Sequence, residues 1–247
     1  LGFAVNSENS LDTVSDRDYL LEFLFSASTF VLHTSGLSED LILWSTSEFN
    51  YIELPDAFCT GSSMMPNKKN PDALELTRGK TSGVLSCLYD LMTNIKGLPL
   101  TYNRDLQEDK RPILHVITTI NMILDVLAPL IGGIMIKEEN IVPHLSKGFL
   151  LATDVAEYLV VKGVPFRETH GIVGHLVQYC IQHHKNLEDL SLEEFQQYCP
   201  AFEKDVYDIL SPQLSVDRRT TFGGTARSEV KRQISVGLEL ISSLKGQ

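Results

Sequence analysis

Apolar positions recur every three or four residues along most of this chain, which is the spacing of one face of an α-helix. The longest such stretch runs from residue 16 to about residue 49, and Ser15 with Asp18 resembles a capping box at its start. Its stripe comprises Leu20, Leu24, Ala27, Val31, Thr34, Leu37, Leu41 and Trp44. An uninterrupted helix over this stretch would be roughly 50 Å long at about 1.5 Å per residue. Helices of this length need long partners, so the pattern predicts a helix bundle.

Two more long helices are predicted after a stretch that is rich in proline, glycine and polar residues. The first begins with Asn70 as its cap and Pro71 at the first helical position, and it ends at Gly97. The second begins near Pro112 and carries a dense apolar stripe. Pro129 lies within that stripe, and we expect it to kink or end the helix because proline has no backbone N–H to donate.

The elements after about residue 145 are expected to be shorter and well capped, with Ser191 and Glu194 forming a capping box. The predicted helices there occupy residues 153–162, 166–184, 191–198, 201–210 and 225–244. No run alternates apolar and polar residues with the period of two that marks a half-buried strand. We therefore predict an all-α fold, in which a long-helix bundle segment at residues 1–145 precedes a small helical domain at residues 146–247.

The composition argues against several classes of function. Lysine and arginine total 21 against 32 aspartate and glutamate residues, so the formal net charge is −11. That charge argues against a nucleic-acid partner and against a basic membrane-binding surface. The longest apolar run, residues 126–136, is too short to span a bilayer. The four cysteines form no C-x-x-C pair, and we expect a reducing, cytoplasmic location.

The densest chemistry lies in the loop at residues 61–71, which reads GSSMMPNKKNP. A glycine and two hydroxyls precede two lysines and a predicted helix start, where unpaired N–H groups and the helix dipole favour anions. The pattern therefore fits an anion-binding loop, although a flexible surface loop followed by a helix cap would explain the same residues. The loop lacks the second glycine of a Walker A phosphate loop, and it does not contain the G-x-S-x-G of a nucleophile elbow.

This loop resembles the signature G-S-S-x-M-P-x-K-x-N of the fumarase/aspartase superfamily, and every fixed position matches. Further segments resemble those of the argininosuccinate lyase family within that superfamily. They are Asn9-Ser10, SDRD at 15–18, KNPD at 69–72, YNRDLQEDK at 102–110, LATD at 151–154 and GGTAR at 223–227. Fumarases and adenylosuccinate lyases share the first signature but not this set. The segments are spread over nearly the whole chain, so the resemblance does not depend on one loop.

The resemblance implies an enzyme that splits argininosuccinate reversibly into arginine and fumarate, without a metal or organic cofactor. A proton leaves the carbon beside a carboxylate, and the resulting aci-carboxylate carries two negative charges that need prearranged donors and cations. By similarity, Ser62 is the proton-abstracting base, and Lys68 stabilises both its alkoxide and the developing dianion. By residue type alone, Ser62 could instead be a turn hydroxyl that bonds its own backbone.

The resemblance also implies substrate contacts from Asn70 and, in the polar loop between the second and third long helices, from Tyr102, Gln107 and Lys110. An amide, a phenol and an ammonium can hydrogen-bond or pair with the polar groups of such a substrate. Asn70 could also be only a helix cap, and the second loop could be only a polar connection whose acidic residues face water. Arg17 could organise the site through an ion pair or merely stabilise the start of a helix.

The resemblance further implies a homotetramer whose central helices form one bundle and whose active sites each draw on three subunits. The family's H-T-H-x-Q-type motif, which carries the general-acid histidine, has no match here. We therefore expect the chain to be about the C-terminal half of the enzyme and to be inactive alone. No histidine is predicted to bind metal. Two alternatives stay open: a delta-crystallin-like structural protein of the same fold, and a related lyase that releases fumarate from another substrate.

Overall fold

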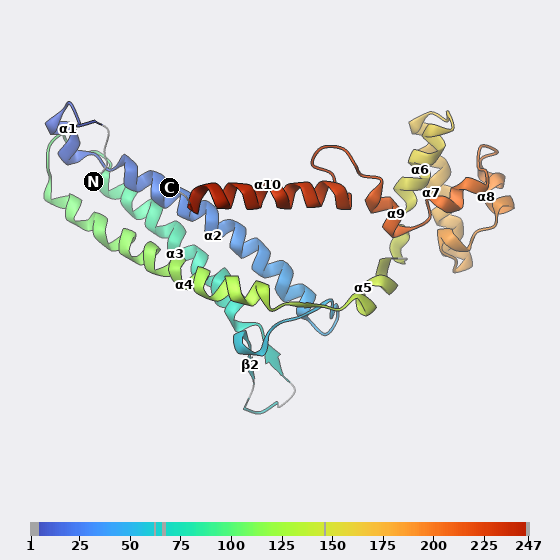
Figure 1. Ribbon diagram of the computed structural model, residues 1–247, viewed down its shortest axis with the longest axis horizontal. Coiled ribbons are helices and arrows are strands. Elements are labelled where there is room, and N and C mark those ends of the chain that lie inside the picture. Colours follow the sequence, from blue (N-terminus) through green and yellow to red (C-terminus); the bar gives the residue numbers. More distant parts are fainter. Residues whose placement is uncertain (1–4, 62, 66–67, 146, 246–247) are drawn as a thin grey trace. The chain divides into compact units, whose positions relative to one another are not determined.

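The structure is a computed structural model that describes residues 5–61, 63–65, 68–145 and 147–245 (Figure 1). The chain divides into two compact units, Leu1–Asn140 and Ile141–Gln247, which we call the bundle unit and the C-terminal unit and describe separately. Helices dominate both units, so the predicted all-α fold is confirmed. The predicted domain boundary after residue 145 stays a prediction, and the helix α5 (Glu138–Leu145) contains the point where the two units divide.

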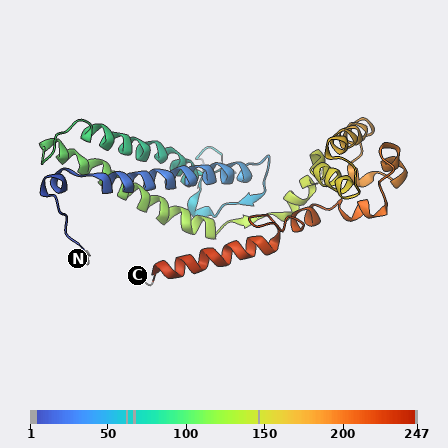
Figure 2. The ribbon, with the colours of Figure 1, turned by 90° about the horizontal axis from the view of Figure 1, so that it is seen from above.

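Three long helices build the bundle unit: α2 (Asp18–Ser45), α3 (Asp72–Ile95) and α4 (Lys110–Gly132). They lie side by side in both ribbon views, and α3 contacts both of the others (Figures 1 and 2). A short helix, α1 (Ser10–Ser15), precedes α2. Apolar residues of the three long helices share one core, whose fully buried members are Leu24, Val31, Leu74, Val84, Val116 and Leu130.

The start of α2 differs from the prediction. The N-cap residue of α2 is Arg17, and no side chain caps the helix there. The Ser15 hydroxyl instead donates to the carbonyls of Leu11 and Asp12, within α1. The predicted capping box of Ser15 and Asp18 is therefore wrong, because the chain forms a separate short helix before α2 and Ser15 ends that helix.

Short paired strands connect the long helices at one end of the bundle unit. β1 (Ile52–Glu53) pairs with β4 (Met135–Ile136), and β2 (Thr60–Gly61) pairs with β3 (Lys69–Asn70). Both pairs are antiparallel, and a 3-10 turn, η1 (Asp56–Phe58), separates β1 from β2. The signature segment at residues 61–71 therefore contains the end of β2 and the whole of β3.

Asn70 is a strand residue, paired with Thr60 in this hairpin. The helix α3 begins at Asp72, and its N-cap residue is Pro71, without a side-chain cap. The prediction that Asn70 caps α3 is therefore wrong, because pairing with Thr60 extends the backbone at Asn70, and the helix begins one residue later than predicted.

The polar loop between α3 and α4 contains a 3-10 helix, η2 (Arg104–Asp109), which continues directly into α4 at Lys110. The helix α4 thus begins slightly before the predicted start near Pro112. Pro129 lies inside α4, which ends soon afterwards at Gly132, so its missing backbone donor weakens only the last turn.

The C-terminal unit contains shorter helices. They are α6 (Ala152–Val161), α7 (Phe166–His183), α8 (Leu192–Tyr198), α9 (Pro212–Asp217) and α10 (Arg227–Lys245), with 3-10 turns η3 (Lys147–Phe149), η4 (Leu187–Asp189) and η5 (Lys204–Asp208). Of these helices, α6, α7 and α8 contribute buried residues to a core of the unit's own. Phe195 and Phe202 are fully buried at its centre, with their rings 4.9 Å apart. The predicted capping box of Ser191 and Glu194 is confirmed.

Two helical segments of the bundle unit, Asp18–Ser45 and Arg104–Gly132, are long and apolar enough to cross a membrane by length and composition alone. The core helices of soluble proteins pass the same test, so this is weak evidence. Much of their apolar surface is exposed in the single chain. The exposed apolar residues of α4 comprise Leu114, Ile117, Met122, Leu124 and Ile131.

Candidate functional site

The signature loop closes the β2–β3 hairpin at one end of the bundle unit. Ser62, the predicted base, lies outside the described residues. Lys68, its predicted partner, is described: its side chain is exposed, and its backbone N–H donates to the carbonyl of Met65 at 3.0 Å. Lys68 directly precedes the first residue of β3.

Lys69, the second lysine of the loop, is occupied by structural contacts. Its ammonium lies 2.5 Å from a carboxylate oxygen of Asp56 and donates to the carbonyl of Leu54 at 2.6 Å. The hydrogen bond with Asp56 is the main cause that raises the pKa of Lys69. Lys68, by contrast, has no ion pair among the residues that the structure describes. Within the described part of the chain, Lys68 is therefore the lysine of this segment whose charge is not paired.

Two further contacts fix the base of the hairpin. The Thr60 hydroxyl donates to the carboxylate of Asp72, at the start of α3. Asp72 is favourably placed there because its negative charge complements the positive end of the helix dipole. Glu53 of β1 lies 2.9 Å from the ammonium of Lys137 and 3.8 Å from that of Lys69. The hydrogen bond with Lys137 is the main cause that lowers the pKa of Glu53.

Asn70 is half-buried, and its side chain makes no hydrogen bond to the residues that the structure describes. Toward the described residues, its amide therefore has both donors and its acceptor unpaired. Its predicted role in substrate binding is untested and stays a prediction.

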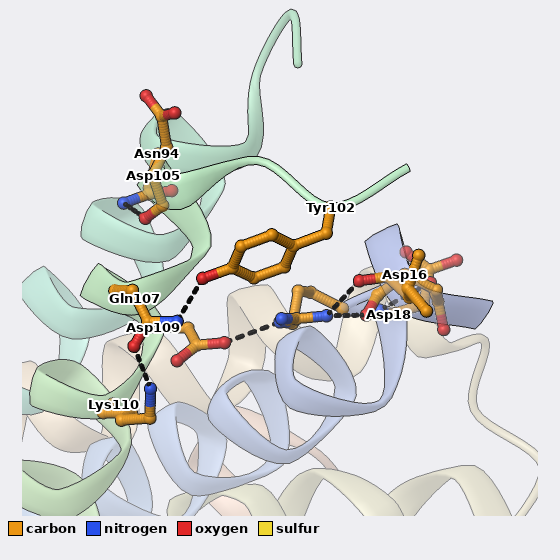
Figure 3. A network of polar contacts seen from close by, with 10 residues as sticks. Asp16, Asp18, Asn94, Tyr102, Asp105, Gln107, Asp109 and Lys110 are labelled. Atoms are coloured by element: carbon orange, nitrogen blue, oxygen red, sulfur yellow. Dashed lines mark hydrogen bonds and ion pairs between the residues drawn. The ribbon is translucent and has the colours of Figure 1, made fainter. Parts of the chain in front are cut away.

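The second cluster lies around η2, in residues 102–110, which we call the η2 segment (Figure 3). It contains three of the predicted residues. The side-chain amide of Gln107 donates to the phenol oxygen of Tyr102, and the ammonium of Lys110 donates to the amide oxygen of Gln107 at 2.7 Å. All three side chains are exposed. The structure therefore brings Tyr102, Gln107 and Lys110 together into one exposed polar cluster.

The backbone before Tyr102 is strained. Thr101 has a φ of 75°, in the left-handed region that β-branched residues rarely adopt. The side-chain amide of Asn103 donates to the carbonyls of Pro99 at 3.1 Å and Thr101 at 3.2 Å, and so holds this turn. Strain of this kind persists where surrounding contacts fix the chain, and it concentrates at functional sites.

Arg17 and Asp109 form an ion pair beneath this cluster, with 2.6 Å between Nε and the carboxylate oxygen. Sequence reasoning considered an ion pair for Arg17 but did not identify its partner. The alternative interpretation of this loop, as a polar connection whose acidic residues face water, is wrong for Asp109, because that residue is buried. No local signal could have revealed the pair, since its members are 92 residues apart in sequence.

The two clusters lie at opposite ends of the bundle unit. The signature hairpin precedes α3 and the second cluster follows it, as the ribbon shows (Figure 1). The 24 residues of α3 span roughly 36 Å at about 1.5 Å per residue. The two clusters therefore do not meet in one site within a single chain.

Comparisons with known proteins agree with the motifs. A family described as "Argininosuccinate lyase C-terminal" matches residues 149–217, and one described as "Lyase" matches residues 1–86. An argininosuccinate lyase of Caldicellulosiruptor bescii is 51% identical over 245 residues, which are 99% of this chain and 53% of the relative. One of Syntrophus aciditrophicus is 53% identical over 234 residues, which are 95% of this chain and 50% of the relative. The chain belongs to the argininosuccinate lyase family.

Within the argininosuccinate lyase family, the chain spans about half the length of the curated relatives it matches. Both relatives bear the name of an enzyme, so the crystallin-like alternative is not favoured, nor is a lyase for another substrate. Solved structures share the fold. EDDS lyase in complex with formate has a TM-score of 0.88 and 26% identity, over all of this chain and 51% of that one. A class II fumarase from Schistosoma mansoni has a TM-score of 0.65 and 19% identity, over 83% and 41%.

Proposed function

We propose that the complete protein is an argininosuccinate lyase that splits argininosuccinate reversibly into L-arginine and fumarate. The observation that carries this proposal is an identity of about one half to enzymes of that name over nearly the whole chain. The intact signature loop and the joined Tyr102, Gln107 and Lys110 cluster support it.

In the proposed reaction, Ser62 removes a proton from the carbon beside a substrate carboxylate. A serine can do this only if its alkoxide is stabilised, and each unit of pKa lowering needs about 1.36 kcal/mol of preferential interaction with the charged form. The ammonium of Lys68 and backbone N–H groups of the loop are the proposed source of that interaction. The available charge of Lys68, compared with the paired charge of Lys69, supports this assignment.

The intermediate is an aci-carboxylate with two negative charges, and it forms only where donors already point at it. It then expels the guanidinium nitrogen, which releases arginine and leaves fumarate. We assign the binding of substrate polar groups to Asn70 and to the second cluster. Lys110 would pair with a carboxylate, while Tyr102 and Gln107 would hydrogen-bond beside it.

The proposed site needs several copies of the chain. Roughly 36 Å of α3 separates the two clusters within one chain, so a site that uses both must take them from different subunits. The exposed apolar residues on α2, α3 and α4 support such an assembly, because a soluble protein rarely leaves so much apolar surface in water. We propose a homotetramer with active sites shared between subunits.

The remaining parts of the proposal concern partners and location. The reaction consists of proton transfer and charge stabilisation, which side chains and backbone donors can supply, so we propose no cofactor. The net charge of −11 supports the absence of a nucleic-acid partner. We propose a cytoplasmic protein without a membrane partner, whose long apolar helices pack against other copies of the chain.

Complementation between two inactive variants tests the activity and the shared site together. Ser62→Ala and Lys110→Ala should each reduce fumarate release by the complete protein to near background, followed by its ultraviolet absorbance. Mixed assemblies of the two variants should regain activity, because some sites take the signature loop from one variant and the second cluster from the other. With random 1:1 mixing, about a quarter of the sites would be intact.

Two results would contradict this proposal in different ways. An unmodified complete protein that releases no fumarate from argininosuccinate would refute the activity. Active parent protein with inactive single variants and no recovery on mixing would place both clusters in one chain's site. The matched control is Arg78→Gln, which removes an exposed pair with Glu39 on the side of the bundle and should leave turnover unchanged.

A further inference from the structure

Asp109 differs from the other acidic residues of the second loop because it is buried. Its side chain is 12% exposed, and that of its partner Arg17 is 14% exposed. Arg17 also donates from Nη1 to the carbonyl of Asp16 at 2.6 Å. Among the ion pairs of the described residues, this pair is the one most shielded from water on both sides. Water and salt therefore screen it less than they screen the surface pairs.

The η2 segment has a buried face and an exposed face. Leu106 and Asp109, three residues apart, are buried, whereas Gln107 and Lys110, also three residues apart, are exposed. A spacing of three places each pair on one side of a tight helical turn. The carboxylate of Asp109 thus anchors the buried face of the turn, and Gln107 and Lys110 lie on its exposed face.

Neither Arg17 nor Asp109 stabilises the start of its own helix through its side chain. Arg17 is the N-cap residue of α2, where the positive end of the helix dipole disfavours a cation. Asp109 is the N-cap residue of α4, yet its carboxylate caps no backbone N–H there. Both side chains instead join the starts of two helices that are distant in sequence (Figure 3).

We propose that Arg17 and Asp109 are positioning residues that hold Gln107 and Lys110 in register for the substrate. This inference rests on the proposed function of the second cluster. The pair fixes the backbone between the two exposed side chains, so their polar groups keep one mutual geometry. Without the pair, the amide of Gln107 and the ammonium of Lys110 are still present, but the turn that carries them can move. Small misplacements of such groups reduce catalytic efficiency strongly.

Asp109→Asn in the complete protein tests the role, because asparagine keeps the shape and removes the charge. We expect kcat/KM for argininosuccinate to fall by about 10-fold or more, with KM rising, at a temperature where circular dichroism shows the variant folded. The matched control is Asp90→Asn, which breaks the exposed pair of Asp90 with Arg111 beside the same turn. The control should change kcat/KM by less than about 2-fold.

A double variant separates positioning from a merely structural role. If Asp109 acts through Gln107, Asp109→Asn should cost much less in a Gln107→Ala background than in the parent protein, because coupled residues are not additive. Arg17→Lys is the second route if Asp109→Asn does not fold. Lysine keeps the charge but carries its donors on one nitrogen, so it cannot replace both the Nε contact with Asp109 and the Nη1 contact with the Asp16 carbonyl, and the same rise in KM is expected.

Each outcome decides a different question. A folded Asp109→Asn protein with unchanged kcat/KM, or an equal loss in both backgrounds, would overturn the positioning role while the lyase activity stands. A parent protein without turnover would overturn the proposed function and this inference with it. A loss that largely vanishes in the Gln107→Ala background would support the inference.

Discussion

The bundle unit and the core of the C-terminal unit use apolar residues in opposite ways. In the C-terminal unit, α6, α7 and α8 close around Phe195 and Phe202, which are fully buried within one chain. In the bundle unit, each long helix buries one face and leaves large apolar side chains on another, among them Phe25, Leu76 and Leu124. One region completes its core alone, while the other has the composition of a core that needs further helices.

The polar groups of the C-terminal core and of the β2–β3 hairpin also differ. In the C-terminal unit, Asp154 is buried and fully engaged, since it accepts from the Ser215 hydroxyl at 2.8 Å and pairs with Arg219 at 3.1 Å. In the bundle unit, the predicted site residues Lys68 and Asn70 are unpaired among the described residues. This difference supports the proposed assembly, in which the bundle unit contacts other copies of the chain. The last helix, α10, belongs with the bundle unit in this respect because none of its residues is buried.

The sharpest test of this comparison places a charge on the exposed stripe of α4. Leu124→Asp should dissociate the proposed assembly at micromolar concentration and abolish turnover, because a carboxylate would be buried in an apolar contact. Sedimentation velocity measures the assembly. The matched control, Val161→Asp, changes an apolar side chain that is 82% exposed in the C-terminal unit, and its sedimentation should match the parent protein. An intact Leu124→Asp assembly would mean that this stripe faces water.

The next largest effect should appear in the self-contained core. Phe202→Ala removes a fully buried ring that packs on Phe195 at 4.9 Å and on Tyr158 at 5.9 Å. We expect a loss of about 3–5 kcal/mol in the stability of this core. Hydrogen exchange in peptides of α6, α7 and α8 measures it locally, and the assembly of the bundle should persist.

An exposed phenylalanine of the same unit provides the control for that change. Phe222 is 88% exposed, with its ring centroid 4.2 Å from the Arg232 guanidinium, so Phe222→Ala should cost no more than about 1 kcal/mol. Equal losses for the two phenylalanine variants would show that burial in this core does not set its stability.

Sequence patterns were sufficient for features that depend on neighbouring residues. The three-to-four periodicity located all three long helices, and the Ser191–Glu194 capping box was correct because both partners lie within one turn. Local patterns failed at Ser15, which ends the short helix α1 and does not cap α2, and at Asn70, where a distant segment competes. Asn70 looked like a helix cap, but pairing with Thr60 turned it into a strand residue.

The candidate site shows the same limit. The signature loop and the second cluster were found as sequence motifs, and the structure places Tyr102, Gln107 and Lys110 in contact. The Arg17–Asp109 pair was not predictable because nothing near either residue indicates its partner. The distance between the two clusters also needed the fold, since it depends on an uninterrupted α3 between them. Catalytic roles for Ser62 and Lys68 stay predictions.

The smallest expected effect concerns pH and the polar shell of the C-terminal core. Glu194 accepts hydrogen bonds from Lys185 at 2.6 Å, from the Tyr179 hydroxyl at 2.7 Å and from the Ser191 backbone at 2.8 Å. These bonds, led by that with Lys185, lower the pKa of Glu194 from 4.5 to about 2. A carboxyl group whose pKa is lower in the folded state stabilises the fold above its unfolded pKa.

The stabilisation by Glu194 should therefore be complete above pH 4.5 and should fade as the pH falls toward 2. Glu194→Gln removes the charge, so its free energy of unfolding should be lower at neutral pH and should decline less in this acid window. Hydrogen exchange in peptides of α8, followed across denaturant concentrations at several pH values, measures the difference in the free energy of unfolding. Glu239→Gln, at an exposed position of α10, should reproduce the pH dependence of the parent protein. Parallel pH curves for the parent and Glu194→Gln would show that these three hydrogen bonds do not couple to folding, and that the C-terminal core owes its independence to apolar burial alone.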